Sequence, residues 1–167
     1  MAPTLDHVFT MRMFTSPDKA LVIPDAKSNN QRIIAFLNHG NITGSGFEAE
    51  LQPGGADWIL RDPDTNTGHL DIRVQYRSKE GQGMYIHLQG ILHIDEKWMD
   101  VFTGSPKART LEFGENEWLG SPIIETSNPD LKWVERSAFV SELRWFVDDN
   151  GSVAVDNAIY KVNPSKV

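Results

Sequence analysis

Two neighbouring segments of this chain alternate strictly between apolar and polar side chains, and a short turn joins them. Every second residue from Leu70 to Tyr76 is apolar, and the same alternation runs from Met84 to Gln89. The residues between them, Ser78 to Gln82, include a glycine and suit a hairpin turn. The sequence therefore predicts two antiparallel strands with one apolar face and one polar face.

The length of the turn fixes the register of these two strands and groups their polar residues on one surface. The predicted pairs are Asp71 with Gln89, Arg73 with His87 and Gln75 with Tyr85. This surface has two interpretations, because a sheet with one solvated face turns it to water, whereas a barrel could turn it inward. A buried arginine and aspartate would then have to be paired or used in chemistry.

The remainder of the chain repeats the pattern of short β-prone runs separated by Gly, Pro, Asn and Asp. It predicts a single all-β domain over residues 1–167, a small antiparallel β-barrel of the lipocalin or calycin kind with a ligand-sized lumen. One helical turn is expected from Pro129 to Glu135, and the segment from Trp98 to Trp118 is expected to be irregular and to cap one mouth. The predicted strands are Asp6 to Met13, Gln31 to Phe36, Gly46 to Leu51, Trp58 to Arg61, His69 to Arg77, Gly83 to Ile91, Arg109 to Phe113, Phe139 to Val147 and Val153 to Val162.

Composition excludes several classes of function. The chain has 167 residues and no cysteine, so thiolate chemistry and disulfides are excluded, and a cytoplasmic location is the default expectation. Asp6 and His7 interrupt the place where a signal peptide needs its apolar core, and no apolar run is long enough to span a membrane. The net charge is -7 with its 16 basic residues dispersed, so neither a membrane nor a nucleic acid is expected as a partner.

Metal and cofactor sites are not expected either. The five histidines, of which His87 and His93 come closest to a ligand pair, lack the spacing of a barrel metal site. The Gly81-Gln82-Gly83 run lies in a hairpin and not before a helix, so it does not predict a nucleotide-binding loop. No Gly-x-Ser-x-Gly motif of a serine hydrolase is present.

Three motifs carry a resemblance to a known family. The run Pro53-Gly54-Gly55-Ala56-Asp57-Trp58, followed by Leu70-Asp71-Ile72-Arg73 and by the turn at Glu80-Gly81, resembles the signature of domain-of-unknown-function family 3237. The segments Leu131 to Val140 and Ala158 to Val162 are similar to the end of that family. The resemblance implies a small β-barrel with Asp57, Asp71 and Arg73 in the lumen. Fungal members resemble accessory enzymes of secondary metabolism, which implies cofactor-free ring closure, isomerisation or dehydration of polyketide-like or phenolic substrates.

These observations lead to the hypothesis of a cofactor-independent cyclase or isomerase that acts on a small aromatic molecule. Arg73 would stabilise an oxyanion, His87 or Asp57 would transfer a proton, Tyr85 would donate a hydrogen bond to a carbonyl, and Asp71 would orient Arg73. Four further side chains are expected to contact the substrate: Trp58, Gln75, Gln89 and Trp133.

Two alternatives to the enzyme hypothesis stay open. A non-catalytic binding barrel would use the same pocket, and its lumen would be chiefly aromatic and aliphatic with a lone polar anchor. A structural subunit is expected if the polar face is fully solvated and no pocket exists. A homodimer is compatible with all three hypotheses. The five tryptophans serve core packing in the simplest interpretation, although stacking on a flat ligand is their alternative use.

Overall fold

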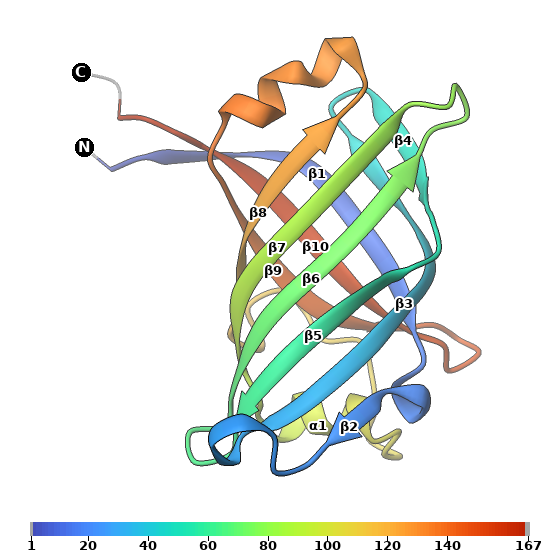
Figure 1. The fold of residues 1–167 in the computed structure, drawn as a ribbon, viewed down its shortest axis with the longest axis vertical. Coiled ribbons are helices and arrows are strands. Elements are labelled where there is room, and N and C mark those ends of the chain that lie inside the picture. The colour runs from blue at the N-terminus through green and yellow to red at the C-terminus, as the bar shows by residue number, and fades with distance from the viewer. Residues whose placement is uncertain (1, 166–167) are drawn as a thin grey trace.

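The computed structural model describes residues 2–165, and within them one antiparallel sheet of ten strands closes into a barrel (Figure 1). The closed ring confirms the predicted fold class. The strands are β1 (Thr4–Thr15), β2 (Leu21–Ile23), β3 (Gln31–Gly44), β4 (Phe47–Leu51), β5 (Gly55–Asp62), β6 (Thr67–Arg77), β7 (Gly83–His93), β8 (Trp118–Thr126), β9 (Phe139–Val147) and β10 (Val153–Asn163).

The barrel closes through the long strand β3, which lies between β1 on one side and both β4 and β5 on the other. Close approach of β1 and β3 requires glycine at residue 40. A Cβ atom at Gly40 would lie 1.9 Å from the carbonyl oxygen of Arg12. Glycine at this position therefore lets the first strand pair with the third and close the ring of strands.

The β6–β7 hairpin has the predicted register. Asp71 pairs with Gln89, Arg73 with His87 and Gln75 with Tyr85. In the turn, the N–H of Ser78 donates to the carbonyl of Gln82 at 2.9 Å. Period-2 alternation on two strands and a turn of known length were sufficient to predict this register.

The barrel interior is filled by the apolar halves of the alternating strands. On β6 the buried residues are Leu70, Ile72, Val74 and Tyr76, whereas Asp71, Arg73 and Gln75 are half-buried or exposed. The apolar face of the hairpin thus faces the lumen, and its polar face is the outer surface of the barrel. This arrangement follows from the hydrophobic effect, because polar side chains inside the closed barrel would lose their hydrogen bonds to water.

Two features of the region between β7 and β9 differ from the prediction. No strand forms from Arg109 to Phe113, because this segment turns back on itself through a hydrogen bond from Glu115 N–H to the Glu112 carbonyl. Strand β8 was not predicted, since Gly120 and Pro122 interrupt its pattern. A proline is tolerated there because β8 pairs with β9 only at Leu119 and Gly120 and is otherwise open on that side.

Each end of the barrel is covered by a short helical segment (Figure 1). Helix α1 (Glu96–Phe102) lies at one end, so the segment predicted to cap a mouth does so, although it contains a helix that was not predicted. The 3-10 helix η3 (Pro129–Arg136) lies at the opposite end and confirms the expected helical turn. The shorter 3-10 turns η1 (Pro17–Lys19) and η2 (Lys27–Asn29) flank β2. None of the helices formed by residues 2–165 is both long and apolar enough to span a membrane.

Candidate functional site

Three of the predicted site residues form a cluster on the outer face of β6 and β7. The Arg73 guanidinium donates to both carboxylate oxygens of Asp71, at 3.1 and 3.2 Å, and the His87 Nε2 atom lies 2.8 Å from Asp71 Oδ1. Partial burial works to raise the pKa of Asp71, but hydrogen bonds from Arg73 and His87 outweigh it, and the pKa is lowered. The pairing predicted between Asp71 and Arg73 is therefore present.

This cluster does not line the lumen, so the position that the family resemblance implied for Asp71 and Arg73 is wrong. The Arg73 side chain is 52% exposed and the Asp71 side chain 34% exposed. Both residues alternate with inward-facing Leu70, Ile72 and Val74, and this parity points them outward. The outer cluster is thus an ion-paired surface feature.

Most of the expected substrate contacts also lie outside the lumen. Trp58 flanks the outer cluster, with the Arg73 guanidinium 6.0 Å from its ring centroid. Gln75 donates to the Pro53 carbonyl at 2.6 Å, and Tyr85 and Gln89 occupy the same face. Trp133 belongs to η3, where it stacks on Phe9 with ring centroids 6.3 Å apart. Trp133 therefore packs against the core and does not join the other predicted contacts.

Asp57 is the predicted catalytic residue that does face the interior. It pairs across the sheet with the inward-facing residues Ala35 and Ile72, and only 4% of its surface is exposed. Its Oδ1 atom accepts a hydrogen bond from the backbone N–H of Asp71 at 3.1 Å. The carboxyl is therefore held in one orientation by the strand that carries the outer cluster.

The surroundings of Asp57 disfavour its charged form. Burial raises the pKa of this carboxyl to about 7, and the hydrogen bond from Asp71 N–H offsets only part of that effect. A carboxyl that exchanges its proton near neutral pH is suited to general acid and base catalysis. Among the predicted site residues, Asp57 thus combines interior position with a perturbed proton affinity.

The Asp57 side chain lines an enclosed cavity at the α1 end of the barrel. The cavity measures about 20 Å³, which is room for about one water molecule, so the lumen is smaller than the ligand-sized space expected. Large side chains of α1, β8 and β9 fill the remaining volume. The lining residues are Met13, Thr15, Ala35, Leu37, Asp57, Ile59, Ile72, Trp98, Phe102, Trp118, Trp145 and Val155.

Four hydrogen-bonding atoms of this lining have no partner among the described residues. They are the indole Nε1 atoms of Trp98, Trp118 and Trp145 and the hydroxyl of Thr15. Buried polar atoms in folded proteins are normally paired with protein or water, so leaving these four atoms unpaired costs stability. The sequence offered all five tryptophans as possible ligand contacts but did not group these three with Thr15, because no spacing connects β1, α1, β8 and β9.

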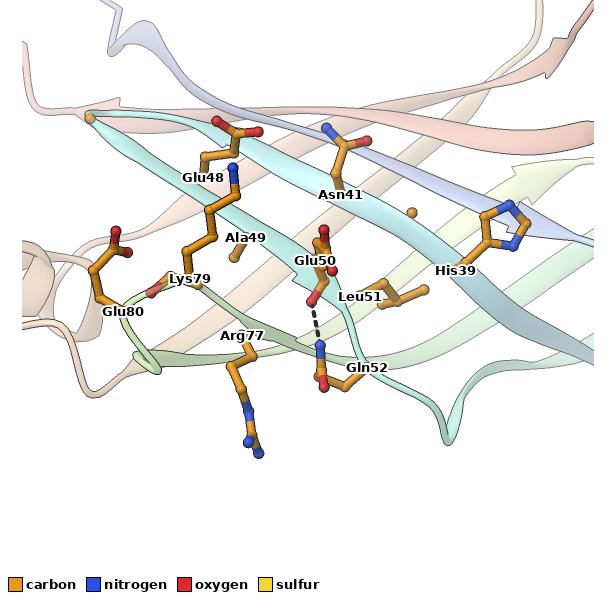
Figure 2. Close-up of a pocket in the computed structure, with 13 residues that line it drawn as sticks. His39, Asn41, Glu48, Ala49, Glu50, Leu51, Gln52, Arg77, Lys79 and Glu80 are labelled. Atoms are coloured by element: carbon orange, nitrogen blue, oxygen red, sulfur yellow. Dashed lines mark hydrogen bonds between the residues drawn. The ribbon is translucent and has the colours of Figure 1, made fainter.

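A wider hollow on the outside of the barrel has a different character. The groove measures about 710 Å³ and lies between β4 and the β6–β7 turn (Figure 2). It carries three acidic residues and one basic residue, all exposed to solvent: Glu48, Glu50, Glu80 and Lys79. Figure 2 marks one hydrogen bond between the residues of this groove, which the Gln52 side chain donates to the nearby Glu50 carbonyl at 3.1 Å. No predicted site residue lies in this groove.

The arrangement of the described side chains does not indicate a metal site. Across residues 2–165, His, Asp and Glu side chains do not gather in groups of three or more that could hold an ion. The polar groups of the cavity-lining residues are one carboxyl, one hydroxyl and three indoles, and the surface of the cavity itself is apolar. These groups suit hydrogen bonding to an organic ligand better than coordination of a cation.

Comparison with known proteins agrees with the barrel fold. A curated relative, a UPF0311 protein of Clostridium acetobutylicum, is 24% identical over 138 residues, covering 81% of this chain and 82% of its own. A β-barrel-like protein from Acinetobacter baumannii aligns with a TM-score of 0.71 at 16% identity, over 96% of each chain. A protein described as an enzyme from Penicillium herquei aligns with a TM-score of 0.60 at 15% identity, over 95% of this chain and 96% of its own.

The family assignment rests on nearly the whole chain. Residues 3–162 match the family described as protein of unknown function (DUF3237). This match includes strand β5, which holds Asp57, and both strands of the β6–β7 hairpin. The chain therefore belongs to the DUF3237 family.

Proposed function

We propose that this protein is a cofactor-independent enzyme that transfers a proton within a small aromatic, polyketide-derived molecule bound in the barrel lumen. The reaction would be a ring closure, an isomerisation or a dehydration. One observation carries the proposal: Asp57 is buried among the residues that line the lumen cavity, and the pKa of its carboxyl is raised to about 7. The chain lacks cysteine, which fits a reducing compartment, and we place the reaction in the cytoplasm.

A ring closure of a phenol onto an enone illustrates the chemistry available to one carboxyl. Ionised Asp57 accepts the phenol proton while the phenol oxygen forms a bond to the β carbon of the enone. The electron pair of the carbon–carbon double bond moves through the α carbon to the carbonyl oxygen and generates an enolate. Protonated Asp57 then returns the proton to the α carbon, so the product is an isomer of the substrate and Asp57 is regenerated.

The proposal removes Arg73, His87 and Tyr85 from the reacting centre. These residues occupy the outer face of the sheet, whereas Asp57 faces the lumen from the other side of the same wall. Asp71 keeps an indirect role, because its backbone N–H positions the Asp57 carboxyl. We therefore describe Asp71 as a positioning residue.

Substrate entry requires the α1 end of the barrel to open. A cavity of about 20 Å³ cannot hold an aromatic ring, since ligand pockets usually enclose roughly 300 Å³ or more. Trp98 and Phe102 of α1 form part of the cavity wall, with ring centroids 4.9 Å apart. Movement of this seven-residue helix away from the barrel end would enlarge the cavity without disturbing the ring of strands.

The similarity in fold to an enzyme from Penicillium herquei supports an enzymatic function. The alternative, a non-catalytic binding barrel, is favoured by a different observation. Asp57 is the one titratable side chain among the residues that line the cavity, and the other walls are chiefly aromatic and aliphatic. A lone polar anchor in an apolar lumen is also what a carrier protein would use.

Turnover and binding measured on the same variant separate these two functions. The probe is an ortho-hydroxychalcone, a phenol joined to an enone whose closure is followed by loss of its visible absorbance. We expect Asp57→Asn to lower turnover by roughly 10²-fold or more and to retain binding, measured by quenching of tryptophan fluorescence. Arg73→Ala is the matched control and should keep both. Binding without turnover in the parent protein would support the carrier, and full turnover by Asp57→Asn would refute the proposal.

A further inference from the structure

Strand β2 forms an edge of the sheet. It pairs with β3 at Leu21, Val22 and Ile23, and no other strand within residues 2–165 pairs with it. An edge strand presents unpaired backbone N–H and C=O groups to any chain that approaches it. Strand β2 is therefore open to pairing with a further strand at the α1 end of the barrel, where Figure 1 shows it.

All three side chains of this strand are apolar and exposed. Leu21 is 50% exposed, Val22 42% and Ile23 44%. Folded proteins commonly protect a sheet edge with charged side chains along the strand, and β2 carries none. Adjacent exposed apolar residues on an unpaired edge indicate a surface that binds another chain.

The apolar surface continues from β2 onto the outer face of the barrel. Leu21 lies opposite Ile34, and Ile34 lies opposite Trp58 on β5. Phe36, two residues further along β3, is 46% exposed on the same face. A chain that pairs with β2 therefore extends an apolar face and does not end at three residues.

The charges that flank β2 fit a second copy of the same chain. Lys19 and Asp25 are both exposed, and neither forms an ion pair with another described residue. In an antiparallel pair of β2 strands with a two-fold axis at Val22, Leu21 of one copy lies opposite Ile23 of the other. The same register places Lys19 of one copy next to Asp25 of the other, and the symmetry repeats this contact.

The charge of the whole chain also favours this edge as the place where two copies meet. The net charge is -7, so two copies repel each other on average. Between residues 17 and 27, however, the acidic residues Asp18 and Asp25 are balanced by Lys19 and Lys27. Two copies can therefore approach through this segment without a net repulsion between the flanking charges.

We propose that β2 is a dimerisation edge, through which two copies of this chain pair antiparallel about a two-fold axis at Val22. The two sheets become continuous, because the paired β2 strands join β3 of one copy to β3 of the other. The pairing occupies the β2 edge of both copies, so assembly stops at the dimer. Asp57 takes no part in this contact, and the inference is independent of the proposed function.

The oligomeric state of the full chain in solution tests this interface. Sedimentation equilibrium over roughly 1 to 100 μM should show a monomer in equilibrium with a dimer. Leu21→Lys should raise the dissociation constant roughly tenfold or more, because it places a charge in an apolar contact. Leu119→Lys is the matched control and should leave the dissociation constant unchanged. Leu119 is 49% exposed but belongs to β8, which pairs with neither β2 nor β3.

The flanking charges test the register of the two strands. Lys19→Asp and Asp25→Lys each place like charges next to one another at both ends of the dimer, so each variant alone should dimerise roughly tenfold more weakly. An equimolar mixture of the two variants should recover the parental affinity, because opposite charges then meet at both ends. Labelling one variant with nitrogen-15 lets native mass spectrometry separate mixed dimers from like dimers.

Three results would overturn the dimerisation edge. The first is a parent chain that stays monomeric up to about 100 μM. The second is a dimer that Leu21→Lys weakens no more than Leu119→Lys does. The third is a mixture of the Lys19→Asp and Asp25→Lys variants that associates no more tightly than either variant alone. Circular dichroism verifies that each variant is folded, so a lost dimer is not mistaken for a lost fold.

Discussion

The Asp57 carboxyl accepts a hydrogen bond of 3.1 Å from the backbone N–H of Asp71, so two acidic residues on opposite faces of one sheet are directly connected. The ladder between β5 and β6 has no paired residues at Trp58 and Ile59, and the carboxyl takes the place of a backbone acceptor there. The same bond holds Asp57 in the lumen and leaves the Asp71 side chain for Arg73 and His87 outside.

Folding stability should depend on pH through Asp57. An acid whose pKa rises on folding binds its proton more tightly in the native state, so its contribution is greatest in acid. That contribution is lost as pH increases from the ordinary pKa of 3.8 to the folded value of about 7. The free energy of unfolding from urea titrations should therefore fall across this range, relative to Asp57→Asn. A difference between the two proteins that stays constant with pH would contradict the raised pKa.

Replacement of Arg73 by alanine should change little. The side chain is 52% exposed, and its ion pair with Asp71 lies at the surface, where such pairs contribute little. We expect the free energy of unfolding to change by no more than about 0.5 kcal/mol, measured by chemical denaturation. Loss of ligand binding in Arg73→Ala would instead assign the site to the outer face.

The buried side chain of Asn157 should make the fold less stable than an apolar residue would. It is fully buried, faces the lumen between Met11 and Leu143, and neither polar atom of its amide has a partner within residues 2–165. Asn157→Leu should raise the melting temperature, because an unpaired buried amide is removed. The free energy of unfolding should increase by about 1–3 kcal/mol. Asn116→Leu is the control and should destabilise, since its amide donates to the His93 carbonyl at 2.8 Å. A lower melting temperature for Asn157→Leu would show that the amide is structural.

Weakening the start of α1 should accelerate ligand entry. The Asp95 side chain accepts a hydrogen bond of 2.8 Å from the backbone N–H of Trp98 and caps helix α1. Asp95→Ala should therefore destabilise the helix by about 1 kcal/mol. Stopped-flow quenching of tryptophan fluorescence should show a faster association rate for the ortho-hydroxychalcone. Asn128→Ala removes the corresponding cap of η3 at the other end and should leave the rate unchanged. Equal acceleration by both variants would argue against entry at α1.

Sequence periodicity predicted the β6–β7 hairpin residue by residue, because two alternating strands and one turn are local features. The same periodicity could not predict which face is inside. An alternating strand looks identical whether its polar residues point to water or to a lumen, and the number of apolar residues that the whole barrel must bury settles the choice. Strand β8 was missed because Gly120 and Pro122 have low strand propensity, which cross-strand pairing with β7 overrides.

The sequence predicted only part of the candidate site, because local patterns do not show which distant residues meet in the fold. Asp57 was identified within the run that resembles the family signature, and the structure places it in the lumen. The three tryptophans that line the cavity are residues 98, 118 and 145, and only the tertiary arrangement brings them together. Side-chain polarity indicated a site on the wrong side of the sheet, since an ion-paired outer surface and a reactive lumen use the same residue types.

The most direct test of a proton-exchanging carboxyl inside the barrel is a titration of Asp57 by nuclear magnetic resonance. Aspartate is labelled with carbon-13 at its carboxyl carbon, and the Asp57 signal is assigned by its absence in Asp57→Asn. We predict a midpoint near pH 7, as burial raises the pKa of this group to about 7. A midpoint at or below the ordinary aspartate value of about 4 would show that Asp57 stays ionised at neutral pH, which contradicts its role as the group that exchanges the proton.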